Sequence, residues 1–309
     1  MSRILVFPGQ GSQAIGMGKD FYDAFPTAKA VFDEVDDTLN YKLSDTIFNG
    51  PIETLSQTEY TQPALMAVSI AVWRVMEQEM RIPWDMFAMT AGHSLGEYTA
   101  LCAARVLTLA DTTRLLKKRG EAFAKAAKEK PGKMLVSLGL PFEKVLDVAI
   151  QTQCFIANDN SPEQVVLSGS EENIARATSL LQEAGAKRCL PLPVSGAFHS
   201  PFLRSAASEV KEALAEIPMM PPILPVISNV SAMPMKIEKD IKRLLFEQVT
   251  STVRWREIIE KAYQKGITDV VEVGAGKVLG NMAKRIVPEM NGFSICSVST
   301  LEEWVSNNR

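Results

Sequence analysis

Short runs of apolar residues alternate along the chain with longer stretches in which apolar positions recur at helical spacing. Ile4–Phe7 is such a run, and mostly apolar runs cover residues 87–91 and 269–273. Continuous apolar runs are typical of strands that are buried on both faces. Helical spacing predicts helices over residues 63–80, 95–105, 111–128, 202–216 and 255–265. Buried strands that alternate with helices predict an α/β fold with a mostly parallel sheet.

The middle of the chain has a different order of elements. The pattern predicts a strand over residues 133–140, a helix over 142–151, strands over 154–158 and 164–168 joined through Asn160-Ser161-Pro162, a helix over 171–184 and a strand over 187–193. This βαββαβ order is that of a ferredoxin-like motif. We therefore expect residues 131–195 to form a small ferredoxin-like subdomain. It is inserted into a larger α/β body made of residues 1–130 and 196–309.

The composition and charge are those of an average globular protein. Hydrophobic residues make up 46% of the 309 residues and charged residues 22%, and 33 Lys and Arg against 36 Asp and Glu give a net charge of −3. These values exclude disordered and fibrous classes of protein. Because there is no basic surplus, we expect no nucleic-acid partner.

The four cysteines lie far apart, and the chain contains only two histidines. They cannot form a zinc set of the usual spacing, so we expect no metal and no other cofactor. The N-terminal apolar run is too short for a signal peptide, and the uncharged, mostly apolar stretch Thr61–Trp73 is shorter than the roughly 18 residues of a membrane span. We expect a monomeric, cytoplasmic protein without a membrane partner.

The clearest signal for catalysis is the sequence Gly92-His93-Ser94-Leu95-Gly96. It follows a predicted strand and precedes a predicted helix, which is the setting of a nucleophile elbow. The glycines permit a sharp turn that exposes the serine hydroxyl, and the helix N-terminus offers free N–H groups to a developing oxyanion. The alternative is a chance match in a loop, and the flanking elements favour Ser94 as a nucleophile.

A serine nucleophile needs a general base, and the chain offers two histidines. His93 adjoins Ser94 on a sharp turn, so we expect its side chain to point away into packing. His199 is therefore the candidate base, although a lone histidine is more often structural. No Asp or Glu between Ser94 and His199 stands out, so the group that orients His199 is either an unidentified carboxylate or a main-chain carbonyl.

Two glycine-rich turns lack the spacing of phosphate-binding loops. Pro8–Gln13 would need a glycine at Ala14 to match the dinucleotide-binding pattern, and Gly274–Lys277 does not have the P-loop spacing. These mismatches disfavour a nucleotide-binding oxidoreductase. A turn at Pro8–Gln13 that points main-chain N–H groups toward the site is the better interpretation.

An arginine interrupts the apolar stripe of the predicted helix over residues 111–128. Leu115, Leu116, Arg119 and Phe123 share one face of that helix. An arginine in such a stripe must find an anion or reach solvent. One interpretation is that Arg119 extends along the edge of the stripe to water. The other is that its guanidinium binds a substrate carboxylate through two hydrogen bonds.

These motifs together resemble those of the malonyl-CoA:acyl carrier protein transacylases, the acyltransferases of type II fatty acid synthesis. The resemblance runs essentially from end to end, and the motifs occur in the same order. They are Phe7–Gln13, Thr61–Ala64, Gly92–Tyr98, Arg119-Gly120, Leu190–Ser195, Ala197–Ser200 and Glu272–Leu279. The family's fold is an α/β-hydrolase-like body with a ferredoxin-like subdomain, in agreement with the pattern above.

The resemblance implies transfer of a malonyl group from malonyl-CoA to the phosphopantetheine thiol of acyl carrier protein, through a malonyl-serine ester. It implies that Ser94 is the nucleophile and His199 its base. Malonyl-CoA and acyl carrier protein would then be the partners, and the product would supply fatty acid synthesis. The stretch Ala197-Phe198-His199 resembles the malonyl-selecting version of the family motif.

The same resemblance assigns further roles. The main-chain N–H groups of Gln10 and Leu95 would form the oxyanion hole. Arg119 would bind the malonyl carboxylate, and Gln62 would be a polar group of the pocket. Gln248 would be the residue whose main-chain carbonyl orients the histidine.

The same residues allow two alternative functions: that of a hydrolase, and that of a non-catalytic protein descended from such an enzyme. A serine thioesterase or esterase would use Ser94 and His199 with water as the acyl acceptor. A non-catalytic module that docks a carrier protein is disfavoured, because the set of Ser94, His199 and Arg119 is intact.

Overall fold

The structure, a computed structural model, describes residues 2–194 and 196–308. The larger sheet consists of β1 (Ser2–Phe7), β2 (Phe87–Gly92), β7 (Val226–Ile227), β8 (Pro234–Met235), β9 (Ile267–Val273) and β10 (Asn291–Ile295). Its strand order is β10-β9-β1-β2-β7-β8. Neighbouring strands pair in parallel except for β7 and β8, which are antiparallel. The fold is therefore mixed α/β with a mostly parallel sheet, as the sequence predicts.

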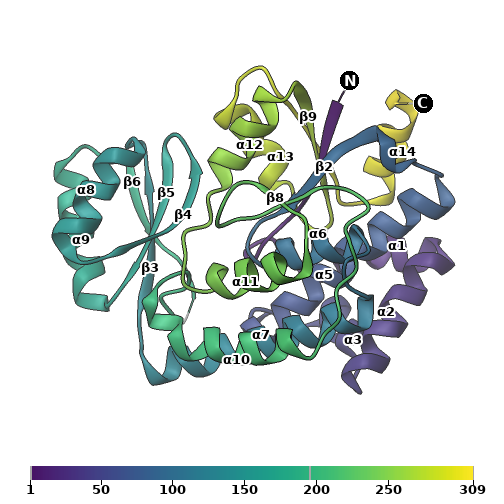
Figure 1. Cartoon of the computed structure of the whole chain (residues 1–309), viewed down its shortest axis with the longest axis horizontal. Helices are drawn as coiled ribbons and strands as arrows, with labels where there is room; N and C mark the ends of the chain where they lie inside the picture. Colours follow the sequence, from purple (N-terminus) through teal and green to yellow (C-terminus); the bar gives the residue numbers. More distant parts are fainter. Residues whose placement is uncertain (1, 195, 309) are drawn as a thin grey trace.

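Helices make up most of the remaining structure (Figure 1). They are α1 (Lys19–Ala24), α2 (Pro26–Leu39), α3 (Leu43–Asn49), α4 (Ile52–Leu55), α5 (Thr58–Arg74), α6 (Leu95–Ala103), α7 (Leu109–Glu129), α8 (Phe142–Thr152), α9 (Glu171–Glu183), α10 (Arg204–Ala215), α11 (Glu238–Gln248), α12 (Trp255–Gln264), α13 (Val278–Ile286) and α14 (Val298–Asn308). A π-helical turn, Val75–Glu79, follows α5, and short 3₁₀ turns cover Trp84–Met86 and Pro201–Leu203. In the described part of the chain, no helix is long and apolar enough to cross a membrane.

The larger sheet is covered on both faces, which explains why four consecutive residues of its inner strand β1, Ile4–Phe7, are apolar. Leu5 and Phe7 of β1 belong to a core that also contains residues of α5, α6 and α7. Ile4 and Val6 belong to a second core with residues of α12 and α13. All four side chains are fully buried. A strand with a core on each face has no position at which a polar residue is favoured.

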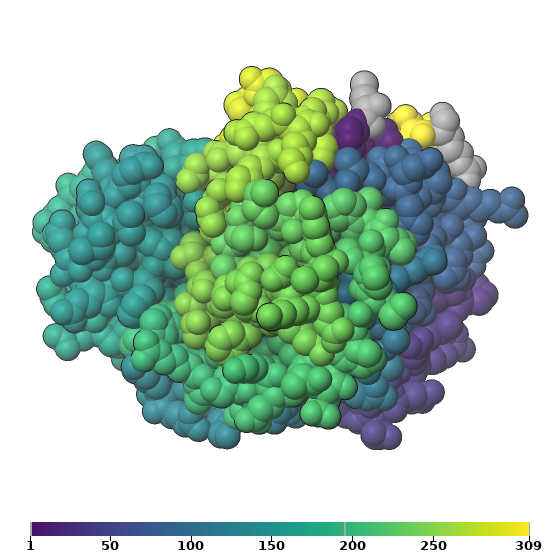
Figure 2. Space-filling model, viewed as in Figure 1, coloured from purple at the N-terminus to yellow at the C-terminus, as the bar shows by residue number. Residues whose placement is uncertain are grey.

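A separate antiparallel sheet occupies the middle of the chain. It contains β3 (Lys133–Leu138), β4 (Phe155–Ser161), β5 (Gln164–Gly169) and β6 (Arg188–Pro191), in the order β4-β5-β3-β6. Leu135 and Leu167 pack against α8 and α9 in a core of their own, whereas Met134 and Val166 join the core of the larger part. Figure 2 shows this part of the chain as a lobe at one end of the molecule.

The structure corrects the sequence analysis in the joint between β4 and β5. The expected joint Asn160-Ser161-Pro162 is wrong, because β4 continues through Ser161. Asp159 and Asn160 are nevertheless only 5% and 6% exposed. Polar residues are placed inside this strand because they bind partners in the larger part: Asp159 pairs with Arg256, and Asn160 bonds to His93.

Candidate active site

Ser94 lies at the sharp turn between β2 and α6, in a conformation that few non-glycine residues adopt. Its φ and ψ are 54° and −109°. A Cβ at Gly92 would lie 1.8 Å from the carbonyl oxygen of Gly96, and a Cβ at Gly96 would lie 2.3 Å from the carbonyl oxygen of Phe7. Only glycine fits at these two positions, so the motif holds the turn tightly against β1 and presents Ser94 at its tip.

His199 is in hydrogen-bond contact with Ser94, although 105 residues separate them. Ser94 Oγ lies 2.8 Å from His199 Nε2, and His199 Nδ1 lies 2.9 Å from the main-chain oxygen of Gln248. A carbonyl oxygen can only accept, so Nδ1 carries the hydrogen and Nε2 is left as an acceptor for the serine hydroxyl. The group that orients His199 is thus a main-chain carbonyl, and no carboxylate is needed there.

The electrostatic surroundings keep His199 neutral. Burial, reinforced by the positive charge of Arg119, lowers the pKa of His199 to about 3. The imidazole is therefore in its basic form at neutral pH.

His93 points away from the hydroxyl, as expected from its position on the turn. Its Nε2 lies 2.9 Å from Asn160 Oδ1, and its ring centroid is 5.7 Å from that of Trp255. Burial lowers the pKa of His93 as well. Its place in packing leaves His199 as the histidine that contacts Ser94.

Two residues that line one cavity with Ser94 have main-chain N–H groups without a hydrogen-bond partner among the described residues. They are Gln10, in the turn after β1, and Leu95, the first residue of α6. The turn after β1 lies close to the elbow, since a Cβ at Gly9 would be 2.8 Å from the carbonyl oxygen of His93. Free N–H groups at such a point can stabilise negative charge on an oxygen.

Arg119 is buried beside the serine hydroxyl and is only 1% exposed. Its Nη2 donates to Ser94 Oγ at 3.1 Å and to Gln248 Oε1 at 2.9 Å, and its Nη1 donates to Gln62 Oε1 at 2.6 Å. The guanidinium also lies 4.3 Å from the ring centroid of Phe123. The interpretation in which Arg119 extends to water is therefore wrong, because neutral acceptors and an aromatic ring surround its charge.

Gln62 contacts a residue that lines the cavity but is not itself part of the lining. Its side chain is 1% exposed and contacts Arg119, and it does not line the cavity. Ser195, the last residue of one resembling motif, lies outside the described residues.

A cavity of about 220 Å³ opens above Ser94 and His199. Its lining includes Arg119 and Phe123 of α7 and Met134 and Asn158 of the antiparallel sheet. The site therefore lies at the junction of the two sheets, with one charged side chain in a mostly apolar wall.

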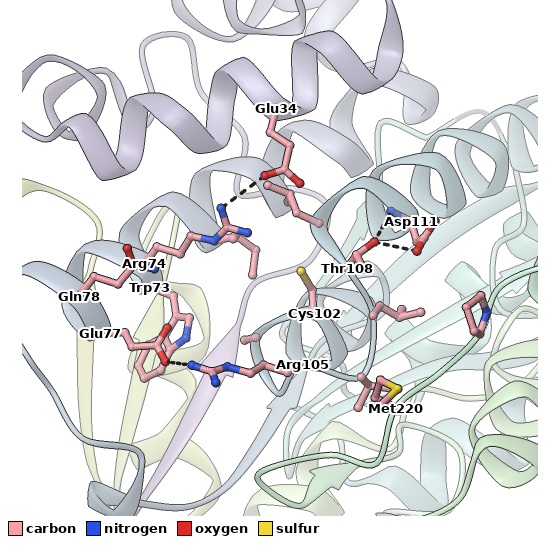
Figure 3. Close-up of a pocket in the computed structure, with 16 residues that line it drawn as sticks. Glu34, Trp73, Arg74, Glu77, Gln78, Cys102, Arg105, Thr108, Asp111 and Met220 are labelled. Carbon is pink, nitrogen blue, oxygen red and sulfur yellow. Dashed lines mark hydrogen bonds and ion pairs between the residues drawn. The ribbon is translucent and has the colours of Figure 1, made fainter.

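A larger cavity of about 580 Å³ lies elsewhere and has different chemistry (Figure 3). Its two arginines are already paired, Arg74 with Glu34 and Arg105 with Glu77. The Ser94 and His199 pair is not part of its lining. The described residues that line this cavity include no unpaired cation for a substrate anion, so the smaller cavity is the better candidate site.

Two residues that hold the elbow are not evident from the sequence. Asn229 Oδ1 accepts from the Ser94 N–H at 2.8 Å, and its Nδ2 donates to the Gly92 oxygen at 2.7 Å. Glu97, fully buried, bonds to Asn229 and Gln248. The available signals are weak: one charged residue in the otherwise uncharged α6, and an asparagine two residues after the short apolar strand β7.

A nucleophile, a neutral base and free N–H groups around one cavity are what an enzyme needs to move acyl groups by way of a serine ester. Comparison with known families agrees on the class. The family described as acyl transferase domain matches residues 4–301, and the chain belongs to that family.

Individual relatives are similar over nearly the whole chain. The malonyl CoA-acyl carrier protein transacylase of Bacillus subtilis is 42% identical over 308 residues, covering 98% of this chain and 96% of the relative. The solved acyl-carrier-protein-S-malonyltransferase of Bartonella henselae is 43% identical, with a TM-score of 0.96 and 99% of each chain covered. A malonyl-transacylase solved in complex with a type II PKS acyl-carrier protein is 36% identical, with a TM-score of 0.95 and full coverage of both chains.

Proposed function

We propose that this acyltransferase moves a malonyl group from malonyl-CoA to the phosphopantetheine thiol of acyl carrier protein and thereby supplies fatty acid synthesis. The contact between Arg119 Nη2 and Ser94 Oγ is the observation that supports the proposal most. It puts a buried cation within reach of the far end of a three-carbon acyl group whose carbonyl carbon is bound to the serine. The names of the relatives point to the same acyl group.

The first half-reaction forms a malonyl-serine ester. Ser94 Oγ attacks the thioester carbonyl carbon while His199 Nε2 takes the hydroxyl proton. The N–H groups of Gln10 and Leu95 stabilise the negative oxygen of the tetrahedral intermediate. The carbon–sulfur bond then breaks, and His199 returns its proton to the departing sulfur of coenzyme A.

The second half-reaction reverses these steps with a new thiol. The phosphopantetheine thiol gives its proton to His199 and attacks the ester carbonyl. The bond to Ser94 Oγ breaks, and His199 protonates the serine. Gln248 keeps the imidazole in the required tautomer through its main-chain oxygen, and Gln62 supports the guanidinium of Arg119. The proposed mechanism requires neither a metal ion nor a cofactor.

The domain division forms part of the proposal. We place the boundaries at residues 131 and 195, with an α/β-hydrolase-like body on either side and a ferredoxin-like subdomain between. The strand order β4-β5-β3-β6 and the separate core around Leu135 and Leu167 support this division. The four free cysteines favour a reducing compartment, and we place the activity in the cytoplasm.

The proposed function is tested by intact-mass measurement after the protein is mixed with malonyl-CoA alone. Wild type should gain one malonyl group, Ser94→Ala should gain none, and the exposed-site control Ser208→Ala should be labelled like wild type. Addition of acyl carrier protein should then remove the group from the enzyme and place it on the carrier. A label that persists in Ser94→Ala or maps to a cysteine contradicts the nucleophile. Rapid release of free malonate without a carrier would instead indicate a thioesterase.

A further inference from the structure

A buried carboxylate next to the candidate active site has no part in the mechanism above. Glu97 lies in the first turn of α6, three residues after the nucleophile, and is fully buried. Its Oε1 accepts from the Asn229 main-chain N–H at 3.2 Å, and its Oε2 accepts from Gln248 Nε2 at 2.5 Å. Burying a carboxylate is unfavourable unless its hydrogen bonds are satisfied, and burial raises the pKa of Glu97 to about 8.

The hydrogen-bond donors and acceptors around Gln248 allow its side-chain amide only one orientation. Its Nε2 also donates to the main-chain oxygen of Ser94 at 2.9 Å, and that oxygen can only accept. Its Oε1 accepts from Arg119 Nη2, and a guanidinium can only donate. Since the Asn229 N–H is also an obligate donor, each Glu97 oxygen accepts one of these hydrogen bonds, whether the carboxyl group is ionised or protonated.

A continuous chain of hydrogen bonds therefore runs from α6 to the nucleophile. Glu97 holds the nitrogen of the Gln248 amide, the oxygen of that amide holds Arg119, and Arg119 donates to Ser94 Oγ. We propose that Glu97 is a positioning residue for acyl-group selection, which fixes the Gln248 amide and through it the guanidinium that receives the substrate carboxylate. This inference rests on the proposed function.

Glu97→Gln tests the proposal with a nearly isosteric change. One of the two oxygens becomes an NH₂ group, which can only donate. It then faces either the Gln248 NH₂ or the Asn229 N–H, which are also donors, so one hydrogen bond is lost. The readout is the ratio of kcat/KM for malonyl-CoA to kcat/KM for acetyl-CoA. We expect this ratio to fall by about three- to tenfold, because only the malonyl group uses Arg119. A general loss of structure would lower both values together and leave the ratio unchanged.

Glu272→Gln is the matched control. Glu272 is also fully buried, and it accepts from the N–H groups of Leu279 and Gly280 at the start of α13. Its substitution should lower stability without changing the ratio. A fall in the ratio as large as that of Glu97→Gln would overturn the proposal.

Gln248→Met keeps the test decisive if Glu97→Gln does not fold. This variant removes the amide but retains the main-chain oxygen that accepts from His199. We expect the same fall in the ratio, and no further fall when the two substitutions are combined, because they break one chain of contacts. An unchanged ratio in either folded single variant, or additive effects in the double variant, would overturn the proposal. Wild type that forms no malonyl-enzyme would instead contradict the proposed function.

Discussion

At the scale of single residues, the site is a set of groups whose hydrogen-bond directions are fixed by their neighbours. The Gln248 main-chain oxygen fixes the tautomer of His199, and Arg119 donates to Ser94 Oγ without competing for Nε2. The same guanidinium helps to keep the imidazole neutral. A substrate carboxylate on Arg119 would offset this charge and raise the basicity of His199 when substrate is bound.

The lowered pKa of His199 leads to a prediction about pH. An ordinary histidine would become protonated, and inactive as a base, as the pH falls through about 6.5. Because burial holds the pKa of His199 far lower, kcat/KM for malonyl-CoA should stay flat between about pH 7.5 and about pH 5. The check is a pH–rate profile on protein shown by circular dichroism to remain folded. An acidic limb centred near 6.5 would contradict it.

The burial of Arg119 leads to a prediction about specificity. Arg119→Ala should lower the preference for malonyl over acetyl thioester by roughly 10- to 100-fold, the worth of a charge-assisted hydrogen bond of about 1.5–3 kcal/mol. Acetyl transfer should fall much less, and Arg119→Lys should restore the preference only in part, because lysine lacks the planar fork. Arg114→Ala, on the exposed side of the same helix, is the control. Equal losses for both thioesters would mean that Arg119 is structural.

At the scale of elements, local signals predict the structure well where the hydrophobic core determines it. The strand before Ser94 and the helix after it follow from apolar patterning and from two glycines, and the stripe on α7 places Arg119 inside the protein. The predicted helix over residues 63–80 is offset, because α5 begins at Thr58 and ends in a π-helical turn.

The remaining elements depend on contacts between distant segments. Helices α1 to α4, α11, α13 and α14 are not among the predicted helices. Asn229 and Gln248 reach the elbow from segments more than 130 residues away, and neither has a local pattern that marks it. The role of Gln248 is predicted from the family resemblance, whereas the role of Asn229 is visible only in the structure. Polar contacts between segments leave no periodic trace in a sequence.

At the scale of the whole molecule, a short seam beside the cavity joins β4 of the antiparallel sheet to residues 252–256 of the larger part. Asn158 of β4 pairs with Val253, and Thr252 Oγ1 donates to the main-chain oxygen of Ile156. Nearby, Arg256 binds Asp159 through two nitrogens at 2.8 and 3.0 Å. Because Asn158 also lines the cavity, this seam helps to hold one of the cavity walls in place.

Arg256→Ala should therefore weaken the molecule more than an ordinary surface substitution does. The Asp159 side chain is only 7% exposed, and loss of its partner leaves a buried carboxylate without compensation. We expect the free energy of unfolding to fall by about 1–3 kcal/mol, as measured by urea denaturation. Arg243→Ala, whose side chain is 51% exposed and pairs within α11, should change it by less than about 0.5 kcal/mol. Similar effects for the two variants would contradict the role of the seam.

The left-handed backbone at Ser94 implies that the protein would be more stable with a different residue in place of this proposed nucleophile. A side chain at φ 54° and ψ −109° costs about 1–3 kcal/mol that glycine does not incur. Ser94→Ala and Ser94→Gly both lose the hydroxyl, so comparing them isolates this cost. Ser94→Gly should melt a few degrees higher than Ser94→Ala, about 1 kcal/mol more stable by calorimetry. Equal melting temperatures would show that the backbone at residue 94 is not strained. The expected difference measures the stability that this position gives up by carrying a reactive serine.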